Sequence, residues 1–229
     1  MKKSIFLLLF FIPSAIALAQ CNDYYVMDEG SAWTYESFDA KGKSAGINEQ
    51  KVTAYQKTGN GFKATIHSIF TDKKGKDVME GDLEMSCQNG TMIIDMRKFL
   101  PEEQLKAFGS YEMKMESENL EVPSKLSVGQ SLKNGSIKMT AVGSPMPMTM
   151  EVNITDRKVV ARESITTPAG TFECYKITSK SISKTHIGIN MSFEFGNTDW
   201  IAEKVGMVKS ESTDKKGKPS GYTILTNRK

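Results

Sequence analysis

The sequence predicts a mainly β protein, built as a curved antiparallel sheet or partly open β-barrel with one short helix. Three observations support this fold class: apolar and polar residues alternate over long stretches, Lys-Gly-Lys turns separate several of these stretches, and a helical pattern occurs at one place. Alternation with a period of two indicates strands with one buried face and one solvent-exposed face. That arrangement is typical of antiparallel sheets.

The first 19 residues predict export. Lys2 and Lys3 precede an apolar run of eight residues that ends at Pro13. This run is too short to span a bilayer and matches the core of a signal peptide. Ala17 and Ala19 supply the small residues that precede a cleavage site, so residues 1–19 are expected to be removed and residues 20–229 to form a single domain.

Two outcomes of export remain open. Cleavage before Gln20 would release the chain into the periplasm without an anchor. Acylation of Cys21 would instead attach it to the outer membrane. Gln20 favours cleavage without acylation, because a small residue is expected immediately before an acylated cysteine.

The charge of the exported chain argues against nucleic acid as a partner. Without Lys2 and Lys3, 28 basic residues face 27 acidic ones, a net charge of +1. Such a chain has no overall field that attracts nucleic acid or an anionic membrane. No transmembrane helix is expected in the exported domain.

Several stretches alternate clearly enough to be assigned as strands. The best are residues 62–66, 83–87, 111–115, 146–155 and 187–196. Hairpin signals recur often enough to suggest about ten to twelve strands. A methionine-rich face could hold Cu(I), but Val152 and Ile154 continue the same face, which favours an apolar interior. The residues predicted to line this interior, as core or as ligand pocket, are Met146, Met148, Met150, Ile189, Met191 and Phe193.

One short helix is expected over residues 101–109. Pro101 suits a first helical turn, Glu102 and Glu103 complement the helix dipole, and Gly109 can end the helix.

Three similar segments, at residues 39–43, 71–76 and 213–218, contain Lys-Gly-Lys. Each lies between two strand-like stretches, with an aspartate able to start a turn and a glycine able to adopt positive φ. A phosphate-binding loop would need more glycines and a following helix. These segments are therefore predicted to be hairpin turns.

No motif points to an enzyme. His67 and His186 are the two histidines, neither has zinc-site spacing, and there is no nucleophile elbow. Charged pairs such as Asp156 and Arg157 are interpreted as solvated surface groups. No catalytic residue, metal or cofactor is expected.

Two stretches carry a family resemblance: "TTPAGTFECYKI" (166–177) and "WIAEKVGMVKSE" (200–211). With "CNDYY", "EGSAWTYESFDAKGK" and "DRKVVARES", in this order, they resemble the TapB-like family of exported bacterial proteins. Val26 and Met27 stand where members often carry a proline. The resemblance implies a β-sheet domain and supplies no catalytic residues.

Two functions are compatible with these observations. The first is a non-catalytic cell-envelope module that binds a lipid or another apolar ligand inside the curved sheet. The alternative is a structural or protein-interaction module of the envelope with a filled core. An internal cavity would favour the first, and a packed interior the second.

The three cysteines allow one disulfide in an oxidising compartment. Cys87 shares an inward face with Leu83 and Met85, and Cys21 begins a segment that needs tethering. We therefore predict a Cys21–Cys87 bridge, with Cys174 as a small buried apolar residue. Acylation of Cys21 would exclude this bridge.

Overall fold

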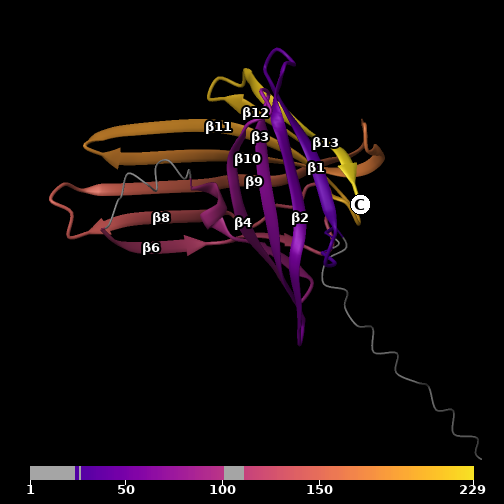
Figure 1. The fold of residues 1–229 in the computed structure, drawn as a ribbon, viewed down its shortest axis with the longest axis horizontal. Coiled ribbons are helices and arrows are strands. Elements are labelled where there is room, and N and C mark those ends of the chain that lie inside the picture. The colour runs from indigo at the N-terminus through magenta and orange to yellow at the C-terminus, as the bar shows by residue number, and fades with distance from the viewer. Residues whose placement is uncertain (1–23, 26, 101–110) are drawn as a thin grey trace, which may run out of the picture.

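The computed structural model describes residues 24–25, 27–100 and 111–229, which form thirteen strands and one 3-10 turn (Figure 1). The first part contains β1 (Ala32–Asp39), β2 (Ser44–Thr58), β3 (Gly61–Asp72), β4 (Asp77–Gln88), β5 (Thr91–Ile94) and η1 (Met96–Phe99). The second part contains β6 (Glu112–Glu118), β7 (Leu120–Pro123), β8 (Gly135–Val142), β9 (Met148–Thr167), β10 (Gly170–Ile187), β11 (Ile189–Ala202), β12 (Gly206–Asp214) and β13 (Pro219–Arg228). The predicted signal peptide, Cys21 and the helix expected over residues 101–109 lie outside the described residues.

All thirteen strands belong to one antiparallel sheet, in the order β6-β8-β9-β10-β11-β12-β13-β1-β2-β3-β4-β5-β7. The predicted fold class is therefore confirmed. The strand number exceeds the expected about ten to twelve, because β5 and β7 have four residues each and are too short to stand out in the sequence.

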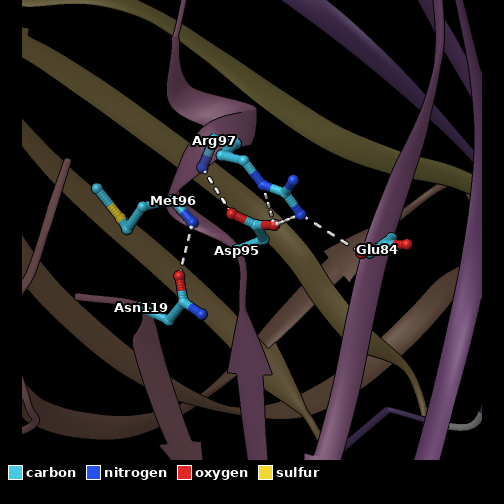
Figure 2. Close-up of polar contacts among 5 residues, drawn as sticks. All are labelled: Glu84, Asp95, Met96, Arg97 and Asn119. Atoms are coloured by element: carbon cyan, nitrogen blue, oxygen red, sulfur yellow. Dashed lines mark hydrogen bonds and ion pairs between the residues drawn. The ribbon is translucent and has the colours of Figure 1, made fainter. Parts of the chain in front are cut away.

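The sheet is nearly closed. Its two edge strands, β6 and β7, are consecutive in the chain and are separated by Asn119 alone. The first half of this segment pairs with β8 and the second half with β5, so one stretch of chain joins both ends of the sheet order. Figure 2 shows Asn119 at this seam, where its Oδ1 accepts a hydrogen bond from the backbone N–H of Met96 at 3.2 Å.

The turn η1 covers part of the seam. Asp95 caps it, since its Oδ1 accepts a hydrogen bond from the backbone N–H of Arg97 at 2.8 Å. The Arg97 guanidinium also pairs with the Asp95 carboxylate and reaches Glu84 on β4 at 3.4 Å (Figure 2). Met96 is fully buried beneath this turn.

Two sets of strands cross one another in Figure 1: β1–β4 run roughly from top to bottom, whereas β6 and β8–β11 run roughly horizontally. The strands β9, β10 and β11 are long, with 20, 18 and 14 residues. Their common end projects away from β1–β4 (Figure 1). At this projecting end the apolar side chains of Ile189, Met191 and Phe193 are exposed.

The core forms where the two sets of strands face each other. The alternation predicted this face correctly in several strands, because Phe62, Ala64 and Ile66 on β3 and Val152 and Ile154 on β9 are all buried. The N-terminal segment is held by directed contacts as well as by packing. The indole Nε1 of Trp33 donates to the carbonyl oxygen of Val205 at 3.1 Å, and the hydroxyl of Tyr24 accepts from the backbone N–H of Leu126 at 3.1 Å.

The three Lys-Gly-Lys segments are hairpin turns of the same geometry, as predicted. In each, the Oδ1 of the aspartate accepts hydrogen bonds from the backbone N–H groups two and four residues later, at 2.8–3.0 Å. The glycine has positive φ each time: 74° at Gly42, 75° at Gly75 and 78° at Gly217. The lysines lie at exposed tips, which is the usual position for residues that keep sheet edges apart.

Candidate functional site

A cavity of about 720 Å³ lies between the concave face of β9–β12 and the seam formed by β5, η1 and β7. Its wall is mainly apolar and includes Leu120, Val122, Val152, Ile154 and Ile177. Protein interiors are close-packed and normally contain few voids larger than a water molecule. This volume lies within the range of about 300–1,000 Å³ that is typical of small-molecule sites.

The inward face of β10 is one reason for the empty volume. Ser179, Ser181 and Ser183 occupy three successive inward positions and line the cavity. Large apolar residues at these positions would fill the interior. The amide Nδ2 of Asn197 on β11 donates to the Oγ of Ser181 at 2.7 Å, which fixes two of the few polar groups on this wall.

The mouth of the cavity is aromatic. Phe193 and Phe195 on β11 line it, although Phe193 is 49% exposed. From the base to the mouth, the inward face of β11 runs through Asp199, Asn197, Phe195 and Phe193. The wall therefore changes from polar to apolar along one strand.

At the base, Arg157 points into the interior because of a β-bulge in β9. Inward positions are even-numbered up to Ile154 and odd-numbered from Arg157 onward. The pairing with β10 shifts register between these positions, and Asp156 adopts φ 54°, in the left-handed region. Bulges commonly redirect a side chain in this way. The interpretation of Asp156 and Arg157 as a solvated pair was therefore wrong for Arg157, which is only 7% exposed.

The guanidinium of Arg157 is held by backbone oxygens. Its Nη1 donates to the carbonyl oxygen of Glu121 on β7 at 3.0 Å and to that of Lys133, just before β8. Burial lowers the pKa of Arg157, and the negative charge of Asp199 opposes this shift. The guanidinium remains charged, since arginine is not deprotonated in proteins.

Asp199 and Tyr25 complete the polar base. The Oδ1 of Asp199 accepts a hydrogen bond from the Oγ of Ser210, its cross-strand neighbour, at 2.7 Å. Burial raises the pKa of Tyr25 above its usual value, and the charge of Asp199 adds to this shift. The base thus combines one buried cation with one carboxylate and two hydroxyl groups.

A second hollow, of about 750 Å³, lies on the other side of η1 and is lined in part by Asp82, Glu84, Asp95 and Arg97. All four charged groups are already engaged, because Arg97 pairs with both Asp95 and Glu84 and Asp82 contacts the ring of His67. We therefore consider the apolar cavity the better candidate for a binding site.

The six residues predicted to line the interior are not brought together. Met148 and Met150 are buried in the core but do not line the cavity, whereas Phe193 lines it. Met146, Ile189 and Met191 are exposed, and Ile189 reaches 66%. Ile189 and Met191 share the inward face of β11 with Phe193, but they lie on the projecting end of the strand, where both side chains are exposed.

Both histidines lie outside this cavity. The ring of His67 lies between Asp82 and Glu80, with Nδ1 to Oδ1 of Asp82 at 2.8 Å and Nε2 to Oε1 of Glu80 at 3.1 Å. On β3, His67 lies on the face opposite the buried Phe62, Ala64 and Ile66. His186 contacts Asn190 across the β10–β11 turn.

The cysteines agree with the sequence prediction as far as they are described. Cys174 is a free, buried thiol, and burial raises its pKa to about 11. Cys87 is fully buried on the predicted inward face of β4. Because Cys21 lies outside the described residues, the Cys21–Cys87 bridge stays a prediction.

The sequence contained signals for the cavity that the alternation alone did not reveal. The repeat Ser179-x-Ser181-x-Ser183 places small polar residues on one face of a long strand. The bulge at Asp156 could not be predicted in the same way, because a left-handed conformation is uncommon for residues other than glycine.

Comparisons with known proteins give a family and a fold. A crystal structure of a protein described as exported and with a YmcC-like fold, from Bacteroides fragilis NCTC 9343, superposes with a TM-score of 0.71 at 21% identity, covering 91% of this chain and 100% of that chain. A second, of a protein described as a lipoprotein from Parabacteroides distasonis ATCC 8503, gives 0.73 at 23% identity, covering 92% and 100%. At these identities the likeness shows the fold alone.

No curated protein matches the chain significantly. Among the described residues, no helix is long and apolar enough to cross a membrane. The resemblance to the TapB-like family stays a prediction. The family model that does match is described as DUF3108-like and extends over residues 28–225. The chain therefore belongs to the DUF3108-like family.

Proposed function

We propose that this protein is a non-catalytic binding module of the cell envelope that holds a lipid or another apolar ligand inside its curved sheet. The observation that carries the proposal is the cavity of about 720 Å³ with a mainly apolar wall. An interior built only for stability would fill such a volume, because packing contributes strongly to stability. The apolar wall with a few polar groups at one end is typical of ligand sites.

A non-catalytic role is supported by the chemistry of the wall. The described residues that line the cavity include no histidine and no cysteine. A nucleophile activated by an adjacent imidazole is therefore not available at this wall. The envelope location is supported by the signal-like N-terminus and by the two structural relatives, which are described as an exported protein and a lipoprotein.

The alternative, a protein-interaction module, is favoured by a different observation. Exposed apolar residues gather on the projecting strand ends and their connections: Val142, Met146, Ile189, Met191, Phe193 and Phe195. Such a group often marks a contact surface. Because Phe193 and Phe195 also line the cavity, we give priority to ligand binding.

Filling the cavity tests the proposal. Ser183→Phe places an aromatic ring at an inward position between Val152 and Phe193. We expect this variant to lose the binding of an apolar naphthylamine dye, measured by fluorescence. Ser192→Phe is the matched control, because Ser192 lies on the opposite face of the neighbouring strand and is exposed.

The control should bind the dye like the wild type. If the wild type does not bind the dye, or if Ser183→Phe binds it equally well, the cavity is not a ligand site. Native mass spectrometry of the protein purified from its own host would then identify any ligand that copurifies.

A further inference from the structure

The polar base of the cavity indicates what kind of ligand it takes. We propose that the site binds long-chain molecules that end in a carboxylate or a phosphate, with the oxyanion at Arg157 and the chain directed toward Phe193. This inference rests on the proposed function and adds the chemical class of the ligand.

The first support is the bonding of Arg157. A guanidinium has five N–H donors. Among the described residues, Arg157 donates through Nη1 only, to the carbonyl oxygens of Glu121 and Lys133. No fully buried polar side-chain atom in the described part of the chain lacks a hydrogen-bond partner. The other guanidinium nitrogens are therefore accessible, and since Arg157 lines the cavity, they are accessible from inside it.

The second support is charge. A buried arginine normally has a carboxylate directly against it, because an uncompensated buried charge is costly. No ion pair joins Arg157 to any described carboxylate, although Asp199 is near enough to influence its pKa. The Oδ1 of Asp199 instead accepts from Ser210. An oxyanion from a ligand would supply the missing bidentate partner.

The third support is the polarity gradient of the wall. Asp199 and Phe193 mark its two ends on β11 and lie six positions apart, or about 20 Å along the strand. On the far side of β10 and its serines, Val152 and Ile154 of β9 add apolar surface to the cavity wall. Beyond Phe193 the same face continues through Met191 and Ile189, which are exposed. A chain anchored at the base would therefore pass from a polar wall to an increasingly apolar one toward the mouth.

Competition for the bound dye by ligands with the same chain tests the inference in the wild-type protein. The competitors are palmitate, hexadecyl phosphate and hexadecanol, with inorganic phosphate as the chain-free anion. We expect palmitate or hexadecyl phosphate to bind at least about tenfold more tightly than hexadecanol, because charge-assisted hydrogen bonds are the stronger kind. Inorganic phosphate should not compete at the same concentrations.

Two variants separate the roles of the charges. Arg157→Gln should weaken the binding of palmitate and hexadecyl phosphate at least about tenfold more than the binding of hexadecanol, so that the preference for the charged head group is lost. Asp199→Asn should increase the preference for palmitate over hexadecanol several-fold, because it removes a like charge near the oxyanion. The second variant and the wild-type comparison remain decisive if Arg157→Gln does not fold.

The possible failures are distinguishable. Equal affinity for palmitate, hexadecyl phosphate and hexadecanol would overturn the head-group assignment and leave the proposed function in place. Competition by inorganic phosphate alone would overturn the role of the chain. Absence of dye binding to the wild type would overturn the proposed function itself.

Discussion

Arg157 on β9 donates a hydrogen bond of 3.0 Å to the carbonyl oxygen of Glu121, on the edge strand β7. The same nitrogen donates to the carbonyl oxygen of Lys133, at the approach to β8. One buried side chain thus connects the two sides of the seam where the sheet closes. Backbone oxygens that lie away from water need such partners, because leaving them unpaired is costly.

Loss of this connection should destabilise the fold. Arg157→Gln shortens the side chain and leaves two backbone oxygens without their donor. At about 1–3 kcal/mol for each acceptor, we expect the free energy of unfolding to fall by about 2–6 kcal/mol. Urea denaturation followed by tryptophan fluorescence measures the change. Lys158→Gln, at the next and exposed position, should stay within about 0.5 kcal/mol; equal effects of the two changes would contradict the role of Arg157.

The bulge that directs Arg157 inward depends on the left-handed backbone of Asp156, with φ 54°. Asp156→Gly accepts this conformation, whereas Asp156→Val resists it at a cost of about 1–2 kcal/mol. Both changes remove the exposed ion pair with Lys180, so the difference in stability between the two variants measures the cost of the left-handed backbone alone. Thermal denaturation of the pair provides the measurement. Equal stability of the two variants would show that the bulge does not constrain this residue.

The seam also requires a glycine at position 135. A Cβ there would lie 2.6 Å from Cδ2 of Leu120 and 2.9 Å from Sδ of Met96. We expect Gly135→Ala to lower stability by about 1–3 kcal/mol through overpacking. Gly59→Ala is the control, because no atom lies within 4 Å of the added Cβ. The prediction fails if denaturant titrations place both variants at the wild-type midpoint.

The hairpin turns should depend on glycine and not on lysine charge. Gly217 has φ 78°, so Gly217→Val should cost about 1–3 kcal/mol. Replacing Lys215 and Lys216 with serine should change stability by less than about 0.5 kcal/mol, since both side chains are exposed. Melting temperatures of the two variants test this contrast. A larger loss in the lysine variant would mean that these side chains have a structural or binding role.

His67 should make the stability depend on pH. Its hydrogen bond to Asp82 raises its pKa above the usual 6.5, although burial opposes the shift. A histidine with a raised pKa stabilises the fold fully below its unfolded pKa of 6.5 and loses this effect as the pH rises through the folded pKa. The stability difference between wild type and His67→Gln should therefore be larger at about pH 5.5 than at about pH 8.5. An NMR titration that places the pKa of His67 at or below 6.5 would contradict this.

The alternation of the sequence could predict the faces of the strands but not what lies opposite them. Met150 and Ile189 illustrate the difference. Both belong to the apolar faces that the pattern assigned to the interior, yet Met150 is fully buried and Ile189 is exposed. A period of two records which side of the sheet a residue occupies. Whether another part of the chain covers that side depends on strand lengths and crossing, which are properties of the whole sheet.

By itself, the sequence determined the local features: the mainly β fold, the inward faces of β3, β4 and the first part of β9 up to Ile154, and the three Asp-initiated turns. These follow from side-chain alternation and from the φ preferences of a few residues, so they need no distant contact. Only the tertiary structure decided the closure of the sheet at Asn119, the inward direction of Arg157 and the cavity beside the serines of β10. Each of these depends on pairing between segments far apart in the chain, where register and bulges are fixed by the partner strands, and no local pattern records them.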